Sequence, residues 1–176
     1  MIRNKNYPER DLIITDQLHE DIKLGYMNNL GKVIVKPIFT SANNFSDGLA
    51  AVKNEERKWG FINKDGTYAI EPRFDVVCDF SEGYAPVILN IDNSAEYSYI
   101  DKKGSIAISP NFISPSTPSE GLILGTQKDF PGRLVCIDYK GHIIFSIKGD
   151  SARWFKEGMA PYMIDKKWGF IKVGLY

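Results

Sequence analysis

The stretch KWGFINKDGTYAIEPRFDVVCDFSEGYAPV, residues 58–87, is partly repeated as KKWGFIKV at residues 166–173. Aligning the sequence with itself gives a period of 35–38 residues. Four segments run from one glycine to a second glycine 17 positions later, and they start at Gly31, Gly66, Gly104 and Gly141. Because the length is constant while the sequence changes, the backbone path is expected to be fixed. The chain is therefore predicted to be a repeat protein.

Each repeat is predicted to begin with a β-hairpin. An apolar residue and Asn or Asp come before the first glycine of every copy, as in Ile62-Asn63 before Gly66. Asn and Asp bond to their own backbone, and glycine adopts the positive φ that tight turns need. Apolar residues alternate along the second strand, which is predicted to end at a proline in three copies. These prolines are Pro37, Pro72 and Pro110.

A loop and a third strand complete each predicted repeat. The third strand follows an acidic residue and a glycine, as in Glu82-Gly83. Phenylalanines recur at fixed positions of the loop and are interpreted as plugs between neighbouring repeats: Phe39, Phe74, Phe112, Phe45, Phe80 and Phe155. The predicted fold class is all-β, with tandem three-stranded antiparallel meanders.

The predicted organisation is one domain built from successive repeats. The boundaries are an N-terminal cap or partial repeat at 1–23, repeats at 24–58, 59–96, 97–131 and 132–167, and a partial repeat at 168–176. Leu12 to Thr15 and the segment at Trp168 are candidates for strands that complete one another and close a propeller-like ring. Alternatively, Ile14, Leu18 and Ile22 recur at helical spacing, so residues 9–22 would be a capping helix on an open, solenoid-like array. We keep both alternatives.

The second repeat resembles the WG (KWG) repeat family of bacterial proteins. The residues that carry the resemblance are Trp59-Gly60-Phe61-Ile62-Asn63, the Gly66 turn, Ile70-x-Pro72, Phe74, Phe80 and Glu82-Gly83-x-Ala85, and Trp168-Gly169-Phe170-Ile171 repeats the opening. The resemblance extends over about residues 24–176. Other copies replace the WG pair by Leu24-Gly25, Tyr97-Ser98 and Leu134-Val135, and the fourth has Ile147 for the proline. The resemblance implies an interaction module with few assigned activities.

Composition disfavours several classes of partner. The 22 basic residues balance the 22 acidic ones, so no overall field attracts nucleic acid or an anionic membrane. No apolar stretch approaches the ~20 residues of a membrane span, and the N-terminus lacks the apolar run of a signal peptide. The protein is therefore expected in the cytoplasm. Cys78 and Cys136 lack metal-binding or redox spacing, and both are expected to be buried as small hydrophobic residues.

No catalytic constellation is recognisable in the sequence. His142 follows the turn glycine Gly141 and is expected to be exposed, while Asp16, His19 and Glu20 are more simply a solvated face than a metal site. The acidic residue before the turn glycine recurs in every copy and is interpreted as a cap for backbone donors. These residues are Asp47, Glu82, Glu120 and Glu157. No enzymatic activity, metal or cofactor is predicted.

Candidate binding residues lie mostly in the connections from a third strand to the next first strand, where insertions of repeat arrays often form a binding surface. Phe130 and Arg133 bracket a Pro-Gly turn, although Phe130 would also fit as a residue packed on the sheet. The other candidates are Asp129, Trp154, Asp92 and Glu96.

The expected function is that of a non-enzymatic scaffold, monomeric or a small homo-oligomer, that binds another protein. An inhibitor, immunity or anti-defence protein is the suggested type. The alternative is a protein that binds or sequesters a small ligand or glycan, with exposed Trp59, Trp154 and Trp168 as stacking platforms.

Overall fold

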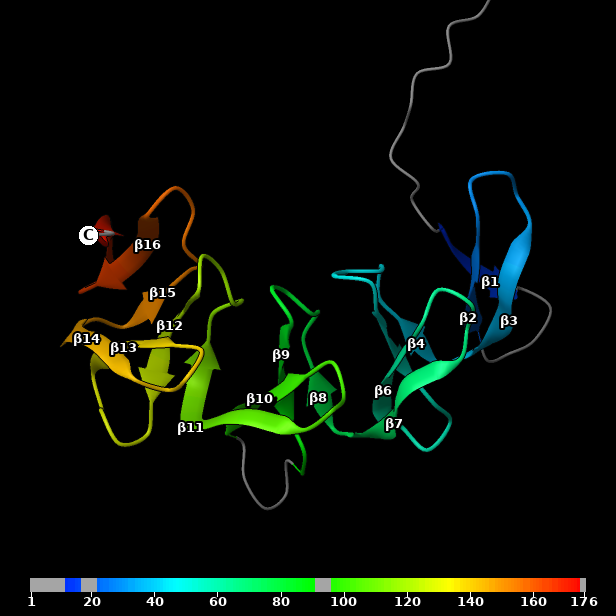
Figure 1. Cartoon of the computed structure of the whole chain (residues 1–176), viewed down its shortest axis with the longest axis horizontal. Helices are drawn as coiled ribbons and strands as arrows, with labels where there is room; N and C mark the ends of the chain where they lie inside the picture. Colours follow the sequence, from blue (N-terminus) through cyan, green and yellow to red (C-terminus); the bar gives the residue numbers. More distant parts are fainter. Residues whose placement is uncertain (1–11, 17–21, 91–95, 175–176) are drawn as a thin grey trace, which may run out of the picture. The chain divides into compact units, whose positions relative to one another are not determined.

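The computed structural model describes residues 12–16, 22–90 and 96–174, and its chain divides into two compact units, residues 1–73 and 74–176. Each unit consists of antiparallel β-sheets, which confirms the predicted all-β class (Figure 1). No helix able to cross a bilayer occurs in these described ranges.

The first unit contains two sheets. One has the order β1 (Leu12–Asp16), β2 (Lys23–Met27) and β3 (Val33–Phe39). The other has the order β4 (Ser41–Ala42), β5 (Ala50–Lys53), β6 (Trp59–Ile62) and β7 (Tyr68–Phe74). A capping helix over residues 9–22 is therefore wrong for residues 12–16, which pair with β2. The β-branched Ile13, Ile14 and Thr15 favour the strand.

The second unit has a seven-stranded and a three-stranded sheet. In chain order the first consists of β8 (Val76–Val77), β9 (Tyr84–Ile88), β10 (Tyr97–Asp101), β11 (Ile106–Pro115), β12 (Leu122–Gln127), β13 (Arg133–Asp138) and β14 (Ile143–Lys148). The second consists of β15 (Ser151–Ala152), β16 (Met159–Ile164) and β17 (Lys167–Lys172). The long strand β11 pairs with β10 through its first half and with β12 through its second half.

The sheets are offset by one strand from the sequence repeats. The first and second strands of a repeat pair as the predicted hairpin, whereas the third strand pairs with the first strand of the next repeat, as β5 does with β6 and β9 with β10. We call each resulting group a blade: the first blade is β1–β3, the second is β4–β7, the seven-stranded sheet comprises two blades that share β11 (β8–β11 and β11–β14), and the end blade is β15–β17. Each repeat therefore contributes strands to two successive blades.

The hairpin between first and second strands is fixed by its Asn or Asp, as the sequence predicts. One carboxylate oxygen of Asp101 accepts the backbone N–H groups of Lys103 and Ser105, both at 2.9 Å. Gly104 has φ +81°, a conformation that costs glycine little. Asn28 and Asp138 bind their own turns in the same way.

The second strand does not end at its proline, so that detail of the prediction is wrong. Strand β3 continues past Pro37 to Phe39, β7 continues past Pro72, and β11 continues past Pro110. In the first blade Leu24 lies opposite Phe39 but Tyr26 lies opposite Val35, so extra β3 residues form a bulge. The bulge accommodates a residue that cannot donate to the ladder.

This bulge explains the glycine of the WG pair. A Cβ on Gly60 would lie 2.6 Å from the carbonyl oxygen of Ile70 and 2.7 Å from the nitrogen of Pro72, because the bulged strand passes directly over it. Gly25 stands against the backbone of Val35 to Pro37 in the same manner. At Gly60 and Gly25 an added side chain would require this backbone to shift, whereas the third repeat has Ser98 opposite its own bulge.

The fourth repeat lacks both the glycine and the proline, and its first two strands pair without this bulge. Val135 stands at the glycine position and Ile147 at the proline position. Strands β13 and β14 run in continuous register from Arg133 opposite Lys148 to Cys136 opposite Phe145. Without the bulge, the second strand leaves room for the Val135 side chain, which is fully buried.

Two of the predicted aromatic plugs, Phe45 and Phe155, lie between blades. Phe45 packs against Tyr26 of the preceding blade, with ring centroids 5.0 Å apart, and Phe155 packs against Leu124, Leu134 and Cys136. Cys136 is buried as expected. The expectation that Cys78 is buried is wrong, because it follows Val77 into an exposed loop.

Replacing Gly60 by Ala is expected to lower the free energy of unfolding by about 1–3 kcal/mol, because the new Cβ meets backbone rather than a movable side chain. Gly169→Ala is the matched control, since its Cβ would meet the Tyr162 ring at 3.0 Å and that side chain can move. We expect about 0.5 kcal/mol or less for the control. Urea unfolding of both variants measures the difference, and equal losses would contradict the explanation of the WG glycine.

The native protein is expected to expose one reactive thiol. Burial raises the pKa of Cys136 to about 12, so this thiol stays protonated and unreactive at pH 8. Partial shielding and the Asp79 carboxylate also raise the pKa of Cys78, which should react more slowly than a free thiol. Ellman's reagent should label one thiol per native chain and two after denaturation. Cys78→Ser should remove the native signal, and labelling of Cys136 in the folded state would contradict the core described above.

Candidate binding surface

The acidic residues before the turn glycines connect successive blades of the second unit. The carboxylate of Glu82 accepts the N–H groups of Glu120, at 2.8 Å, and of Gly121, at 3.0 Å. The hairpin's own hydrogen bonds join Ser119 and Leu122, which leaves the two central N–H groups available. The predicted capping role is confirmed for Glu82 and, as shown next, for Glu120, with the refinement that the capped donors belong to the next repeat.

The next acidic residue repeats this arrangement. Glu120 accepts the N–H groups of Glu157 and Gly158, the latter at 2.9 Å. Tyr139 donates its hydroxyl to Glu82, and burial together with this hydrogen bond raises the pKa of Tyr139 above its ordinary value. The phenol therefore remains a donor, and each carboxylate acts as a fixed, charge-assisted link between blades.

The residue that follows the WG-glycine position in each first strand provides a second kind of contact between blades. The hydroxyl of Tyr26 donates to the carbonyl of Asn43 at 2.7 Å, and that of Tyr99 donates to the carbonyl of Ser116 at 2.8 Å. Cys136, at the same position, packs against Phe155 and Ala160 of the end blade. The members of this column that are 1% exposed or less are Tyr26, Phe61, Tyr99 and Cys136.

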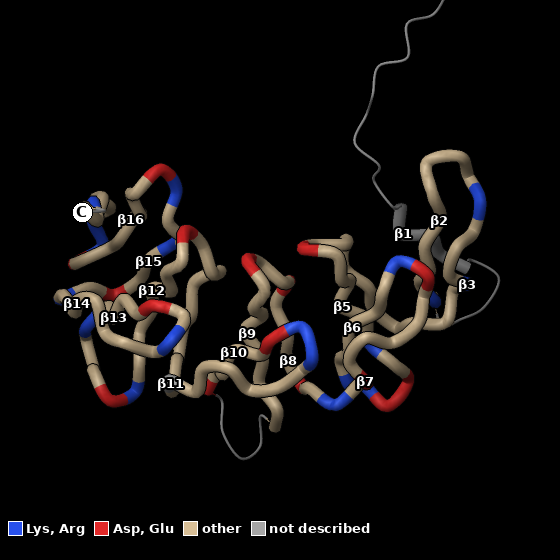
Figure 2. Tube along the Cα trace, in the orientation of Figure 1, with Lys and Arg blue, Asp and Glu red and all other residues tan. Residues whose placement is uncertain are grey.

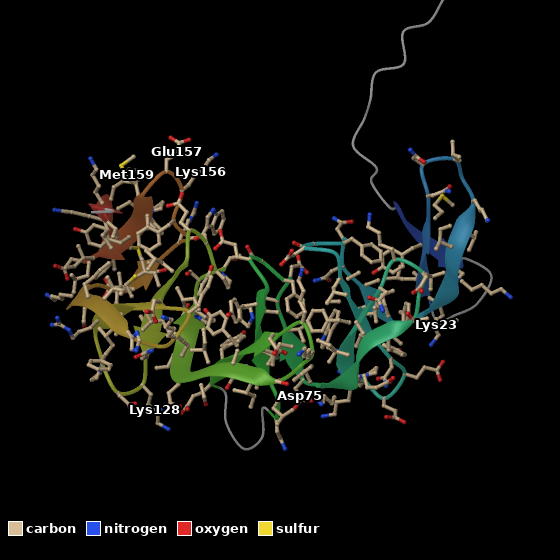
Figure 3. The ribbon with its side chains drawn as sticks, viewed as in Figure 1. Lys23, Asp75, Lys128, Lys156, Glu157 and Met159 are labelled. Carbon is tan, nitrogen blue, oxygen red and sulfur yellow. The ribbon has the colours of Figure 1, made fainter. Side chains whose placement is uncertain are left out.

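The end blade leaves the same column open. Phe170 occupies the position of Tyr99 and Cys136 but is 71% exposed, while Trp168 is 53%, Trp154 49% and Met159 43% exposed. A hollow of about 430 Å³ lies beside them. Its lining residues define what we call the end-blade surface: Arg153, Trp154, Lys156, Glu157, Met159, Pro161 and Phe170. Figure 3 labels Lys156, Glu157 and Met159, which lie on and beside the turn that leads into β16.

Charged groups surround these apolar side chains. The guanidinium of Arg153 lies 5.1 Å from the ring centroid of Trp168, a cation–π distance. Within each unit, basic and acidic segments are interspersed along the described trace rather than gathered in a basic stripe (Figure 2). The surface therefore combines an apolar centre with charges of both signs at its edge.

Four of the sequence-predicted residues lie on or near the turn between β12 and β13. Phe130 is half-buried and packs on the core cluster around Tyr99, while Arg133 donates from Nε to Ser146 Oγ at 2.7 Å. Asp129 accepts from Asn111 at 3.3 Å. Glu96 is bound by Lys128 at 2.7 Å, so the turn is tied to the start of β10. A binding role for this group stays a prediction.

The remaining two predicted residues do not lie with this group. Trp154 belongs to the end-blade surface, and Asp92 lies outside the described residues. Sequence reasoning missed Met159 and Phe170 as surface residues. Phe170 was readable as a member of the aromatic column, but only the arrangement of the blades shows that it is uncovered.

The described residues offer little for metal or acid–base chemistry. No group of three or more His, Cys, Asp or Glu side chains within them is placed to hold a metal ion. His142 is exposed, as expected, and its Nδ1 lies 2.9 Å from the carboxylate of Asp138 in the same turn. His19 and Glu20 lie outside the described residues.

A known protein-family model matches three parts of the sequence. The model of the WG-containing repeat family matches residues 25–57, 59–90 and 136–168, together more than half of the chain. The chain belongs to the WG repeat family. The stretch between the second and third matches contains the copy in which Tyr97-Ser98 replaces the WG pair. No curated protein gives a significant match to the sequence.

Solved structures share the fold of this WG repeat protein. The computationally designed protein Ika8 is 10% identical over 95% of this chain and 57% of that chain, with a TM-score of 0.56. BamB from Moraxella catarrhalis is 12% identical over 96% and 61% of the two chains, with a TM-score of 0.51. KlHsv2 is 11% identical over 94% and 62%, with a TM-score of 0.61. These propeller-like neighbours support the fold alone, and this chain spans about three-fifths of their length.

Paired substitutions in the column test whether the end-blade surface is uncovered. Phe170→Ser is expected to change the free energy of unfolding by about 0.5 kcal/mol or less, because the ring is largely in solvent. Phe61→Ser removes a fully buried ring from the equivalent position and should cost about 3–5 kcal/mol. Chemical unfolding of dilute samples measures both values. Equal costs would show that Phe170 is covered.

Proposed function

We propose that this WG repeat protein is a non-enzymatic cytoplasmic scaffold that binds another protein through its end-blade surface. One observation carries the proposal: Phe170 is 71% exposed in a column whose other members are buried. Contiguous exposed apolar side chains mark interaction surfaces on folded proteins. The surrounding Trp154, Met159 and Arg153 are residue types enriched at protein interfaces.

The character of the surface suits a protein rather than a nucleic acid or a membrane. Lys156 and Glu157 are adjacent at its edge, so the local charges oppose one another instead of adding to a basic field. An apolar centre with a mixed polar rim is the anatomy of a protein interface. Binding without chemistry suits an inhibitor, immunity or anti-defence protein, which acts by occupying its partner.

A comparison of variants tests this function. The tagged chain, Phe170→Ser, Trp154→Ala and Ile106→Ser are each expressed in the source cells, purified gently and analysed by native mass spectrometry. Ile106 is the control, because it is an exposed apolar residue of β11 outside the surface. We expect a stoichiometric protein partner on the wild type and the control that is lost from both surface variants. A partner retained by all four chains would place binding elsewhere, and no partner on any chain would contradict the proposal.

Small-ligand or glycan binding is the second candidate. Trp154 lines the hollow of about 430 Å³ and Trp168 is half-exposed, so two of the three tryptophans have rings available for stacking. Trp59 is only partly exposed and has the Lys53 ammonium 5.6 Å from its ring centroid. In the same spectra, a small bound mass lost with Trp154→Ala and no protein partner would favour this candidate.

A further inference from the structure

We propose that the end-blade surface binds the first blade of a second copy of this chain, so that copies associate head to tail. This inference rests on the proposed function, because it names the partner of the same surface. It follows from what covers each blade inside the chain, from one unpaired carboxylate, and from the construction of the first blade.

The downstream side of a blade is built to receive another blade. Tyr26 is buried by Ala50 and Val52 of β5 and by Phe45 of the loop before it. Cys136 is buried in the same way by Ala160 and Phe155 of the end blade. Phe170 stands at this position of the end blade, so its missing cover is a third strand with the aromatic plug that precedes it.

Glu157 stands at the position of the acidic residues whose carboxylates link successive blades. It has φ +55°, close to the +49° of Glu82 and the +54° of Glu120, so its turn has the same backbone form. Glu82 and Glu120 each hold two N–H groups of the following turn. Across residues 12–16, 22–90 and 96–174, no group pairs with the carboxylate of Glu157. By analogy with Glu82 and Glu120, the Glu157 carboxylate would bind a turn that has two available N–H groups, and each repeat contains such a turn.

The first blade is built like the blades that cover the aromatic column inside the chain. Strand β1 pairs with β2 in the register that β5 makes with β6: Ile14 lies opposite Gly25 as Val52 lies opposite Gly60. Strand β1 therefore has the place in the first blade that β5 has in the second. It is also the last strand of its sheet in the described part of the chain, whereas β5 has β4 beyond it. The chain thus carries both halves of one interface, a heterologous contact in the sense of symmetry.

Two copies can associate in this way because each chain carries both halves of the interface. Head-to-tail association gives a ring, or a filament if the rotation does not close.

The first experiment measures self-association. Sedimentation of the 176-residue chain over a range of concentrations should give a mass that rises above the 19.9 kDa of one copy. Phe170→Ser should raise the dissociation constant at least about tenfold, as loss of a central aromatic anchor does. Glu157→Gln should weaken association less, and Ile106→Ser should leave it unchanged. Each variant is first shown to keep the wild-type unfolding midpoint under dilute conditions.

A complementation experiment identifies the orientation. Ile14→Lys alters the first blade at the register position of Val52, and Phe170→Ser alters the end blade. Each variant alone should remain at one copy, whereas a mixture should form a complex of two copies, since each retains a different intact half. Absence of that mixed complex, or self-association insensitive to Phe170→Ser, would overturn the proposal.

The remaining outcomes separate this inference from the proposed function. One copy at every concentration, with Phe170→Ser and Ile14→Lys both lowering the unfolding midpoint, would mean that the chain closes on its own first blade and would overturn the inference. One copy with a different protein partner sensitive to Phe170→Ser would overturn the inference and leave the proposed function standing. One copy with no partner would overturn both.

Discussion

The structure depends on strand sharing between successive blades. A third strand pairs with the first strand of the next repeat, as β5 does with β6, so no repeat contains a complete sheet of its own. A repeat that cannot satisfy its own ladder or bury its own apolar face is stable only with a neighbour. Burial of the first-strand column, the carboxylate links and the aromatic plugs all follow, because each lies where one blade meets the next. The same constraint makes the two ends of any such array chemically different from its interior.

Local sequence chemistry serves this arrangement in two ways. The paired positive φ values of the acidic residue and glycine leave two backbone N–H groups unused by the hairpin, and the preceding repeat supplies the carboxylate that binds them. In the second repeat the WG glycine lies against the proline of the second strand, since a Cβ on Gly60 would lie 2.6 Å from the carbonyl oxygen of Ile70 and 2.7 Å from the nitrogen of Pro72. The fourth repeat abandons both at once, with Val135 and Ile147, and keeps the strand pairing.

Much of this fold was readable from the sequence because its signals are local. Asp101 and Gly104 specify a hairpin wherever they occur, and glycines 17 residues apart specify its repetition. The errors arose where a local rule met a wider context: a bulge carries the strand past Pro37, β2 pairs with residues that also fit a helix, and Cys78 lies in an exposed loop. The candidate site was the least predictable part. Trp59-Gly60-Phe61 and Trp168-Gly169-Phe170 have the same letters, yet Phe61 is buried and Phe170 is 71% exposed. Whether such a residue is exposed depends on whether a neighbouring blade covers it, and a short stretch of sequence does not carry that information.

The end-blade surface also limits what the proposed partner can be. An apolar patch alone accepts any complementary apolar surface, but the Glu157 carboxylate adds a demand for donors at a fixed place beside it. Inside the chain, two successive N–H groups of one turn meet that demand while a plug and a small-residue strand cover the aromatic column. A partner of another fold must reproduce this spacing with a hairpin and an adjoining apolar strand. The geometry that stabilises the interior therefore sets the recognition chemistry of its open end, and a blade of the same kind satisfies it without any new contact.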